Sequence, residues 1–200
     1  MKIAVSDLLF PGFRKFGIRP LNTEYGIEFF YEFGHDYYWD EETAVWGDRE
    51  FSIHGPCVAV DLADESNLNY LPAFEATFKY AQKINSQFVV VHTNECLPAD
   101  IKAGQELVIS RLAELLEMAQ KYGVTLVIEN VGLRSKGNVL FTLEEYYALF
   151  ERFPQAMSLI DTGHAHVNGW DIPAVVEKLG SKLFAFHIHD NDGNGDDHLP

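Results

Sequence analysis

The chain has 200 residues, of which 47% are hydrophobic, and its formal net charge is −15 at pH 7. This length and hydrophobic content are sufficient for one sizeable core, so we expect a single domain over residues 1–200. The negative charge disfavours general attraction to nucleic acid or to anionic membranes, which leaves small-molecule chemistry as the favoured class of function.

Composition also bears on the compartment. The sequence has no segment typical of a signal peptide, and no apolar run approaches the roughly 18 residues of a membrane-spanning helix. The two cysteines, Cys57 and Cys96, lie far apart and form neither a C-x-x-C motif nor a disulfide framework. We therefore expect two free thiols in a cytoplasmic protein without membrane contact.

The first 54 residues predict short strands separated by irregular segments. Strands are expected at 2–5, 27–33 and 51–54. Two prolines and two glycines make a long helix at 10–25 unfavourable. The acidic, aromatic segment that continues to residue 49 predicts a loop, in which Trp39 either contributes to a substrate pocket or anchors the loop against the core.

From residue 71 onward helices and strands alternate regularly. Apolar periodicity predicts helices at 71–85, 101–122 and 143–153, and a short helix that Asp171 caps and Gly180 ends. Thr142 and Glu145 predict a capping box for the third helix. The intervening apolar runs predict strands at 88–92, 124–129, 157–161 and 183–187, and their continuous hydrophobicity is typical of parallel strands buried on both faces.

This alternation predicts a parallel sheet with right-handed crossovers. Consecutive polar strand ends are separated by 26 to 38 residues. A TIM (β/α)8-type barrel averages about 31 residues per unit, so the spacing favours an α/β fold of this type. No G-x-G-x-x-G motif follows the first strand, which disfavours a dinucleotide-binding fold.

The polar strand ends predict a metal site. They are His54, His92, Glu129, Asp161 and His187. A single histidine at such a place is more simply interpreted as a hydrogen-bonded core residue, but five coincident strand ends favour metal binding at the C-terminal face of the barrel. We expect the last three to bind the ion directly, because they come from successive strands and supply oxygen and nitrogen donors. His54 and His92 are expected to hold a second ion or to bind the substrate.

Several segments resemble the xylose isomerase-like barrels, which include sugar isomerases and epimerases, inosose dehydratases and endonuclease IV. The segments are F-S-I-H-G-P, V-V-V-H-T-N, V-I-E-N-V, L-I-D-T-G-H-A-H-V-N-G-W-D and H-I-H-D-N-D-G-N-G-D-D-H-L-P. The resemblance implies that Glu129, Asp161 and His187 bind a divalent ion such as manganese, zinc, cobalt or magnesium. It favours His187 over His189, because the family's H-x-x-D pattern is matched by His187 and Asp190.

The family pattern continues beyond the last residue of this sequence. Relatives carry a fourth metal ligand, a glutamate from an eighth strand, and the sequence reaches only Pro200. The resemblance therefore implies a barrel truncated before its eighth strand, and the activity of this 200-residue form is in question. An incomplete barrel would expose sheet edges and apolar surface, so a homo-oligomer is expected.

The resemblance to the sugar isomerases implies proton transfer through an enediolate of a sugar or sugar phosphate. Glu129 and His92 are the candidate catalytic residues. Candidate substrate contacts are His54, His164, Trp39 and Arg134. For Arg134, as for Lys136 in the same loop, a solvated surface charge is the simpler interpretation.

Endonuclease IV is the alternative, with zinc-dependent cleavage at abasic sites in DNA. Its three-metal site resembles an extended set of residues here, namely His54, His92, Glu129, Asp161, His164, His187, Asp196 and His198. Against it, only 15 basic residues face 30 acidic ones, whereas a DNA enzyme needs cationic phosphate contacts. Nucleic acid is therefore an unfavoured partner. A non-catalytic relative that binds a metal or a sugar is the third hypothesis.

Overall fold

The computed structural model describes residues 2–9, 17–32 and 34–199, and its centre is one parallel sheet. Seven strands pair in the order of the sequence, each parallel to the next. Their bounds are β1 Ala4–Ser6, β2 Gly26–Phe30, β3 Phe51–His54, β4 Val89–Val91, β5 Leu126–Glu129, β6 Met157–Asp161 and β7 Leu183–His187.

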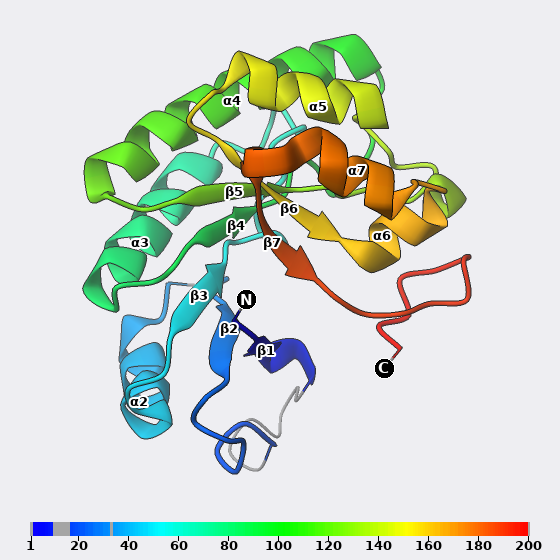
Figure 1. The fold of residues 1–200 in the computed structure, drawn as a ribbon. Helices are drawn as coiled ribbons and strands as arrows, with labels where there is room; N and C mark the ends of the chain where they lie inside the picture. The colour runs from blue at the N-terminus through cyan, green and yellow to red at the C-terminus, as the bar shows by residue number, and fades with distance from the viewer. Residues whose placement is uncertain (1, 10–16, 33, 200) are drawn as a thin grey trace.

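Helices connect the strands and cover the outer face of the curved sheet (Figure 1). The α-helices are α2 Asp36–Trp46, α3 Tyr70–Lys83, α4 Ile101–Tyr122, α5 Leu143–Arg152, α6 Thr162–Val167 and α7 Ile172–Leu179. The described residues also contain the 3₁₀ helices η1 Asp7–Leu9, η2 Arg134–Lys136 and η3 Gly180–Lys182. None of the helices in the described residues is both long and apolar enough to cross a lipid bilayer.

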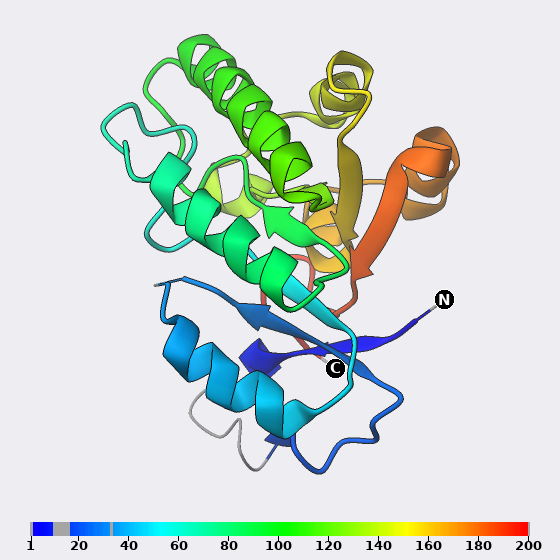
Figure 2. The same cartoon turned by 90° about the vertical axis from the view of Figure 1, so that its left-hand side faces the viewer.

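The sheet curves into an open half-barrel. Within the described residues β1 pairs only with β2 and β7 only with β6, so the two edge strands do not pair with each other. In Figure 2 the N-terminal strand and α2 lie on the opposite side of the opening from β7. The predicted TIM-barrel-type fold without an eighth strand is confirmed in this form.

Two apolar layers hold the sheet. The larger layer lies between the strands and the outer helices, where Ile53, Phe74 and Leu112 are fully buried. A small inner layer consists of Val90, Val127 and Leu159 on the concave face. Because side chains alternate along a strand, the inner position of Val127 places Glu129 on the same face, one step nearer the C-terminal rim.

The structure corrects the prediction of an acidic loop before residue 49. Residues 36–46 form α2, and Trp39, Glu42 and Trp46 face inward at helical spacing. The ring of Trp39 packs 4.4 Å from that of Phe29 and is 5% exposed, so it lies in the core and not at a substrate pocket. The acidic residues made the helix difficult to recognise in the sequence, because only every third or fourth side chain of this segment is buried.

Most other element bounds agree with the sequence analysis. The helix at 101–122 and the strand at 183–187 are confirmed, as is the capping box of Thr142 and Glu145. The expectation of an irregular segment at 10–25 lies partly outside the described residues, and residues 18–25 form turns and bends with no helix or strand. The short helix α6 was not predicted; it starts directly after β6, with Asp161 as its N-cap.

Candidate metal centre

Three side chains converge where β5, β6 and β7 end. One potential ligand atom from each of Glu129, Asp161 and His187 lies within 4.8 Å of the other two. His187 Nδ1 is 3.4 Å from Glu129 Oε1 and 3.8 Å from Asp161 Oδ2. Both carboxylates are 2% exposed, so they need cationic or hydrogen-bonding partners inside the protein.

Asn130 fixes the relative position of the two carboxylate-bearing strands. Its side-chain oxygen accepts a hydrogen bond of 2.6 Å from the backbone N–H of Asp161, and its side-chain nitrogen donates one of 3.1 Å to the Asp161 carbonyl. The amide therefore acts as a bridge between the ends of β5 and β6. Glu129 and Asp161 stay adjacent because their backbones are joined at this point.

A fourth buried group, Glu28, orients the histidine. Glu28 Oε1 lies 2.8 Å from His187 Nε2, and Glu28 Oε2 accepts a hydrogen bond of 3.1 Å from Ser52. When His187 Nε2 donates to Glu28, its Nδ1 keeps a lone pair directed towards Glu129 and Asp161. Sequence analysis missed Glu28, although a glutamate inside the apolar run I-E-F-F-Y was a signal of a buried charge.

Two further histidines lie on the other side of Glu129. His92 Nε2 is 3.0 Å and His54 Nε2 is 3.5 Å from Glu129 Oε2. The second ring nitrogen of His92 lies 2.7 Å from Glu95 Oε1. Glu129 thus has His187 on one side and the pair His54 and His92 on the other.

The carboxylates and histidines of this cluster stabilise each other's charged forms. Burial alone would raise the pKa of Glu129, but the charges of His187 and His92 outweigh burial and hold it well below its usual range. Burial alone would lower the pKa of His92, yet the charge of Glu129 and a hydrogen bond to it raise that pKa to about 10. Burial alone would also lower the pKa of His187, but the charges of Glu28 and Glu129 raise it well above its usual value.

The donor set fits a divalent metal ion. The carboxylates Glu129 and Asp161, together with a neutral imidazole from His187, are the oxygen and nitrogen donors that manganese, zinc or cobalt accepts. Buried carboxylates without a counter-charge are unfavourable, so the site requires positive charge. Protons on the histidines or a metal ion can supply it. The third ligand is already oriented by Glu28, as second-sphere carboxylates commonly orient metal-binding histidines.

The remaining predicted histidines lie close by. His164 Nδ1 is 3.4 Å from Glu129 Oε1, and its Nε2 is 3.5 Å from Asp196 Oδ2. Asp196 also groups with His189 and His198, so these three could hold a cation of their own. Asp196 and His198 were expected near the centre, and both line the same cavity as Glu129.

His189 is closer to the centre than the sequence pattern indicated. Its Nε2 lies 2.9 Å from Asp161 Oδ2, nearer than the 3.8 Å of His187 Nδ1. Of these two histidines, His187 is the one that contacts both Glu129 and Asp161. His164 also contacts both carboxylates, at 3.4 Å and 3.7 Å. Asp190, which the motif paired with His187, forms backbone hydrogen bonds with Leu199 and contributes no carboxylate to the cluster.

A cavity of about 1220 Å³ opens onto the centre. Glu28, Glu129, Asp161, His187 and the pair His54 and His92 all contribute to its wall. A sugar-sized ligand fits a cavity of this size. The polar groups therefore lie where a small molecule can reach them.

Arg134 is not part of this wall. It lines a separate cavity of about 390 Å³ beside Trp170, and its guanidinium contacts the backbone oxygen of Val167 at 3.5 Å. The backbone N–H of Arg134 donates to the side-chain oxygen of Asn168 at 2.8 Å, and both residues line this separate cavity. The structure thus corrects the expected substrate contact, and Lys136 is the basic residue of this loop that faces the large cavity.

Comparison with known proteins decides the family. Residues 48–200 match the family model described as xylose isomerase-like TIM barrel. The chain belongs to this family. The matched range includes every residue of the candidate metal centre except Glu28.

Relatives with curated names are distant. An uncharacterized protein of Methanocaldococcus jannaschii is 25% identical over 79% of this chain and 62% of its own length. Fructoselysine 3-epimerase of Shigella flexneri is 25% identical over 70% of this chain and 45% of its own length. The chain spans about half the length of the curated relatives that it matches.

Solved structures share the fold. A D-tagatose 3-epimerase-like protein has a TM-score of 0.79 at 22% identity, with 100% of this chain and 80% of that chain covered. A D-psicose 3-epimerase, solved in the presence of D-fructose, has a TM-score of 0.74 at 18% identity over 100% of this chain and 78% of that chain. At these identities the likeness concerns the fold.

Proposed function

We propose that this protein is a divalent-metal-dependent isomerase or epimerase of a keto sugar or its phosphate. The observation that carries the proposal is the convergence of Glu129, Asp161 and His187 on one wall of a sugar-sized cavity. The names of the distant relatives, which are 3-epimerases of fructoselysine and of D-psicose, support keto sugars as the substrate class.

Glu129, Asp161 and His187 are the proposed ligands of the ion. Bound there, the ion would supply a Lewis acid for the negative charge that develops on the substrate oxygens. Glu28 holds the ring of His187 in place, and Asn130 holds the two carboxylates adjacent. These contacts orient the ligands before any substrate enters.

Glu129 is the proposed base. It removes the proton from the carbon next to the substrate carbonyl, the C–H electron pair forms a C=C bond, and the π pair of the carbonyl moves onto its oxygen to give an enediolate. Return of a proton to the opposite face of the same carbon gives the epimer. When C1 of a 2-ketose has lost the proton, return to C2 gives the aldose isomer. The lowered pKa of Glu129 makes it a weak base, so it needs a partner that accepts the proton.

His92 is the proposed partner. Its Nε2 lies 3.0 Å from Glu129 Oε2, and its Nδ1 lies 2.7 Å from Glu95, whose side chain is 39% exposed. When the ring of His92 is neutral with its proton on Nδ1, Nε2 can take a proton from Glu129 while the Nδ1 proton moves to Glu95, a carboxylate in contact with solvent. This route predicts that the transferred hydrogen exchanges with water.

His54 and His164 are the proposed substrate contacts. Both line the cavity beside Glu129, and each retains a ring nitrogen that is directed into the cluster. Imidazole nitrogens at these positions can form hydrogen bonds with sugar hydroxyls. Lys136 takes the place of Arg134 as the candidate contact for a substrate phosphate.

A nuclease of the endonuclease IV type is the second candidate. His189, Asp196 and His198 form a further donor group beside the centre, which favours more than one ion, as the three-metal nuclease has. The net charge of −15 disfavours binding to the phosphates of DNA. We therefore rank this activity second.

Hydrogen exchange tests the proposal. The manganese- or cobalt-loaded protein is incubated in deuterated buffer with fructose, psicose, tagatose and their phosphates, and deuterium next to the carbonyl is measured by NMR. We expect exchange with one substrate, and its loss by a factor of at least about 100 in Glu129→Gln. Glu114→Gln, which changes a surface glutamate, is the matched control and should retain exchange.

The outcomes separate the hypotheses. Undiminished exchange in Glu129→Gln would remove Glu129 from the proposed role. Cleavage of an abasic-site oligonucleotide, without sugar exchange, would favour the nuclease. Tight metal binding with neither activity would identify a non-catalytic binding protein.

A further inference from the structure

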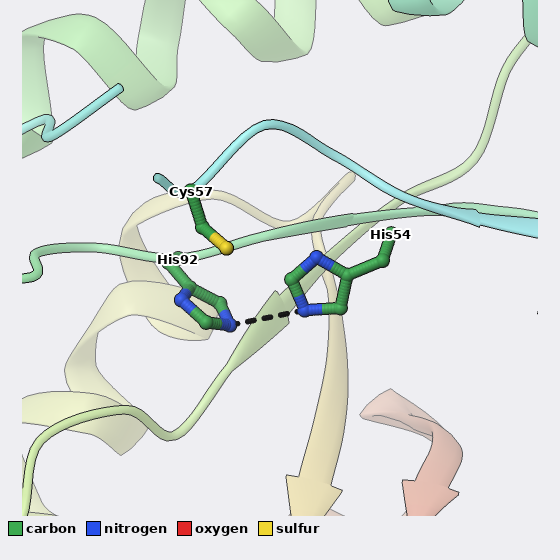
Figure 3. Close-up of side chains that lie close together, drawn as sticks. All are labelled: His54, Cys57 and His92. Carbon is green, nitrogen blue, oxygen red and sulfur yellow. Dashed lines mark hydrogen bonds between the residues drawn. The ribbon is translucent and has the colours of Figure 1, made fainter. Parts of the chain in front are cut away.

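A second group of ligand-type side chains lies beside the centre and contains a sulfur atom. One potential ligand atom from each of His54, Cys57 and His92 lies within 4.8 Å of the other two. Figure 3 shows the sulfur of Cys57 directed towards the two imidazole rings. The sequence analysis considered the two histidines for a second ion but gave Cys57 no role.

The hydrogen bonds of the two histidines direct one nitrogen of each ring into this group. His54 Nδ1 lies 2.9 Å from the carbonyl oxygen of Gly55, so Nδ1 carries the proton and Nε2 keeps the lone pair. His92 Nδ1 donates in the same way to Glu95 at 2.7 Å, which leaves Nε2 as the donor atom of the neutral ring. Backbone carbonyls and carboxylates are the usual partners of metal-binding histidines at this second position.

The two Nε2 atoms lie 3.1 Å apart. In neutral rings this arrangement brings two lone pairs together, and the carboxylate of Glu129 lies 3.0 Å from one of them. Three acceptors at such distances require a shared cation, which is either a proton on His92 or a metal ion. In a tetrahedral zinc site, ligand atoms lie about 3.3 to 3.6 Å apart, so the spacing of the nitrogens is close to that of bound metal.

The loop that carries Cys57 is held in place by a separate carboxylate. Glu32 accepts hydrogen bonds from the backbone N–H groups of Cys57 at 2.6 Å, Val58 at 3.0 Å and Ala59 at 3.4 Å. Cys57 is 8% exposed and forms no disulfide. Burial and the charge of Glu32 raise the pKa of the Cys57 thiol, so the thiolate needs a bound cation to form.

We propose that His54 Nε2, Cys57 Sγ and His92 Nε2 form a second metal site, selective for thiophilic divalent ions such as zinc, cobalt or cadmium. On binding, the thiol loses its proton to solvent and the sulfur forms the bond to the ion. The site shares no ligand with Glu129, Asp161 and His187, so it does not depend on the proposed function. Thiolate favours zinc over magnesium or manganese, which gives the two sites different metal preferences.

Occupation of this site has a consequence for Glu129. A metal bond at His92 Nε2 replaces the hydrogen bond from that atom to Glu129, which is 3.0 Å long in its absence. His92 then no longer connects Glu129 to Glu95. Thiophilic ions in excess should therefore slow a proton transfer that uses this route.

Cobalt spectroscopy tests the site directly. The metal-free full chain is titrated with Co²⁺, and thiolate-to-cobalt charge-transfer absorption in the near ultraviolet is recorded. The chain has only two cysteines, so the band can be assigned by two variants. We expect the band in the wild type and in Cys96→Ser, and its loss in Cys57→Ser.

Two further measurements distinguish this site from the one formed by Glu129, Asp161 and His187. Asp161→Asn should retain the band, since Asp161 belongs to the other ligand set, and its retention would separate this proposal from the first. X-ray absorption of the zinc-loaded wild type should show scattering from a sulfur neighbour, a result that does not depend on any variant folding. A wild type without the charge-transfer band or without sulfur scattering, or a band that persists in Cys57→Ser, would overturn the proposal.

Discussion

Glu28 Oε1 lies 2.8 Å from His187 Nε2, although the two residues are 159 positions apart in the chain. The pair joins β2 to β7 across the inside of the half-barrel, beneath the candidate metal ligands. Glu28→Gln should lower metal affinity about 10- to 100-fold, because the neutral amide holds the ring less strongly and makes Nδ1 less basic. Calorimetric titration with Mn²⁺ measures the effect.

Glu114→Gln serves as the control, since Glu114 is exposed and accepts a hydrogen bond from Tyr70 at the surface, away from the metal centre. It should bind Mn²⁺ as the wild type does. Equal affinity in Glu28→Gln would mean that His187 is oriented by the strand alone.

The hydrogen bonds between Asn130 and Asp161 predict that loss of the Asn130 side chain destabilises the protein. Removal of its side chain in Asn130→Ala leaves the backbone N–H and C=O of Asp161 buried without these partners. Each unsatisfied group costs about 1–3 kcal/mol, so the free energy of unfolding should fall by roughly 2–5 kcal/mol. Denaturant unfolding measures it. Asn22→Ala, at an exposed turn, should change stability far less, and a similar loss in both variants would contradict the bridge.

The sequence predicted the strand ends better than it predicted their surroundings. Hydrophobic runs locate β5, β6 and β7, and parallel strands bring their ends to one rim, so Glu129, Asp161 and His187 could be grouped without coordinates. Glu28 could not be placed among them, because its contact with His187 depends on the curvature that brings β2 opposite β7.

The loops were harder to predict for a different reason. The position of Cys57 depends on three backbone hydrogen bonds to Glu32, and that of Arg134 on a contact with Asn168; neither interaction leaves a periodic pattern in the sequence. In α2 the acidic residues outnumber the buried ones, so its helical period was too weak to recognise.

The placement of Trp39 in the core, where a substrate contact was one expectation, can be tested by mutation. Its ring packs against Phe29 in the core, and Trp39→Ala should lower the free energy of unfolding by about 3–5 kcal/mol. Metal affinity at a temperature where the variant is folded should remain unchanged, because Trp39 does not line the cavity. Tyr37→Ala, in the same helix but 76% exposed, should leave stability unaffected. A weakened substrate response in Trp39→Ala, with stability intact, would restore the pocket role.

The open edge of the half-barrel leads to the last prediction. Among the described strands, β7 has a neighbour only on one side, and Phe184, Phe186 and Ile188 at or near it are 46%, 40% and 79% exposed. An unpaired strand with apolar side chains favours pairing with a second chain. We therefore expect self-association that increases with concentration in sedimentation velocity experiments. Ile188→Glu should shift the protein towards the monomer, since a buried carboxylate at the contact is unfavourable. Leu68→Glu, at a similarly exposed position outside this edge, should not. A wild type that remains monomeric at all concentrations would show that the edge is protected in solution.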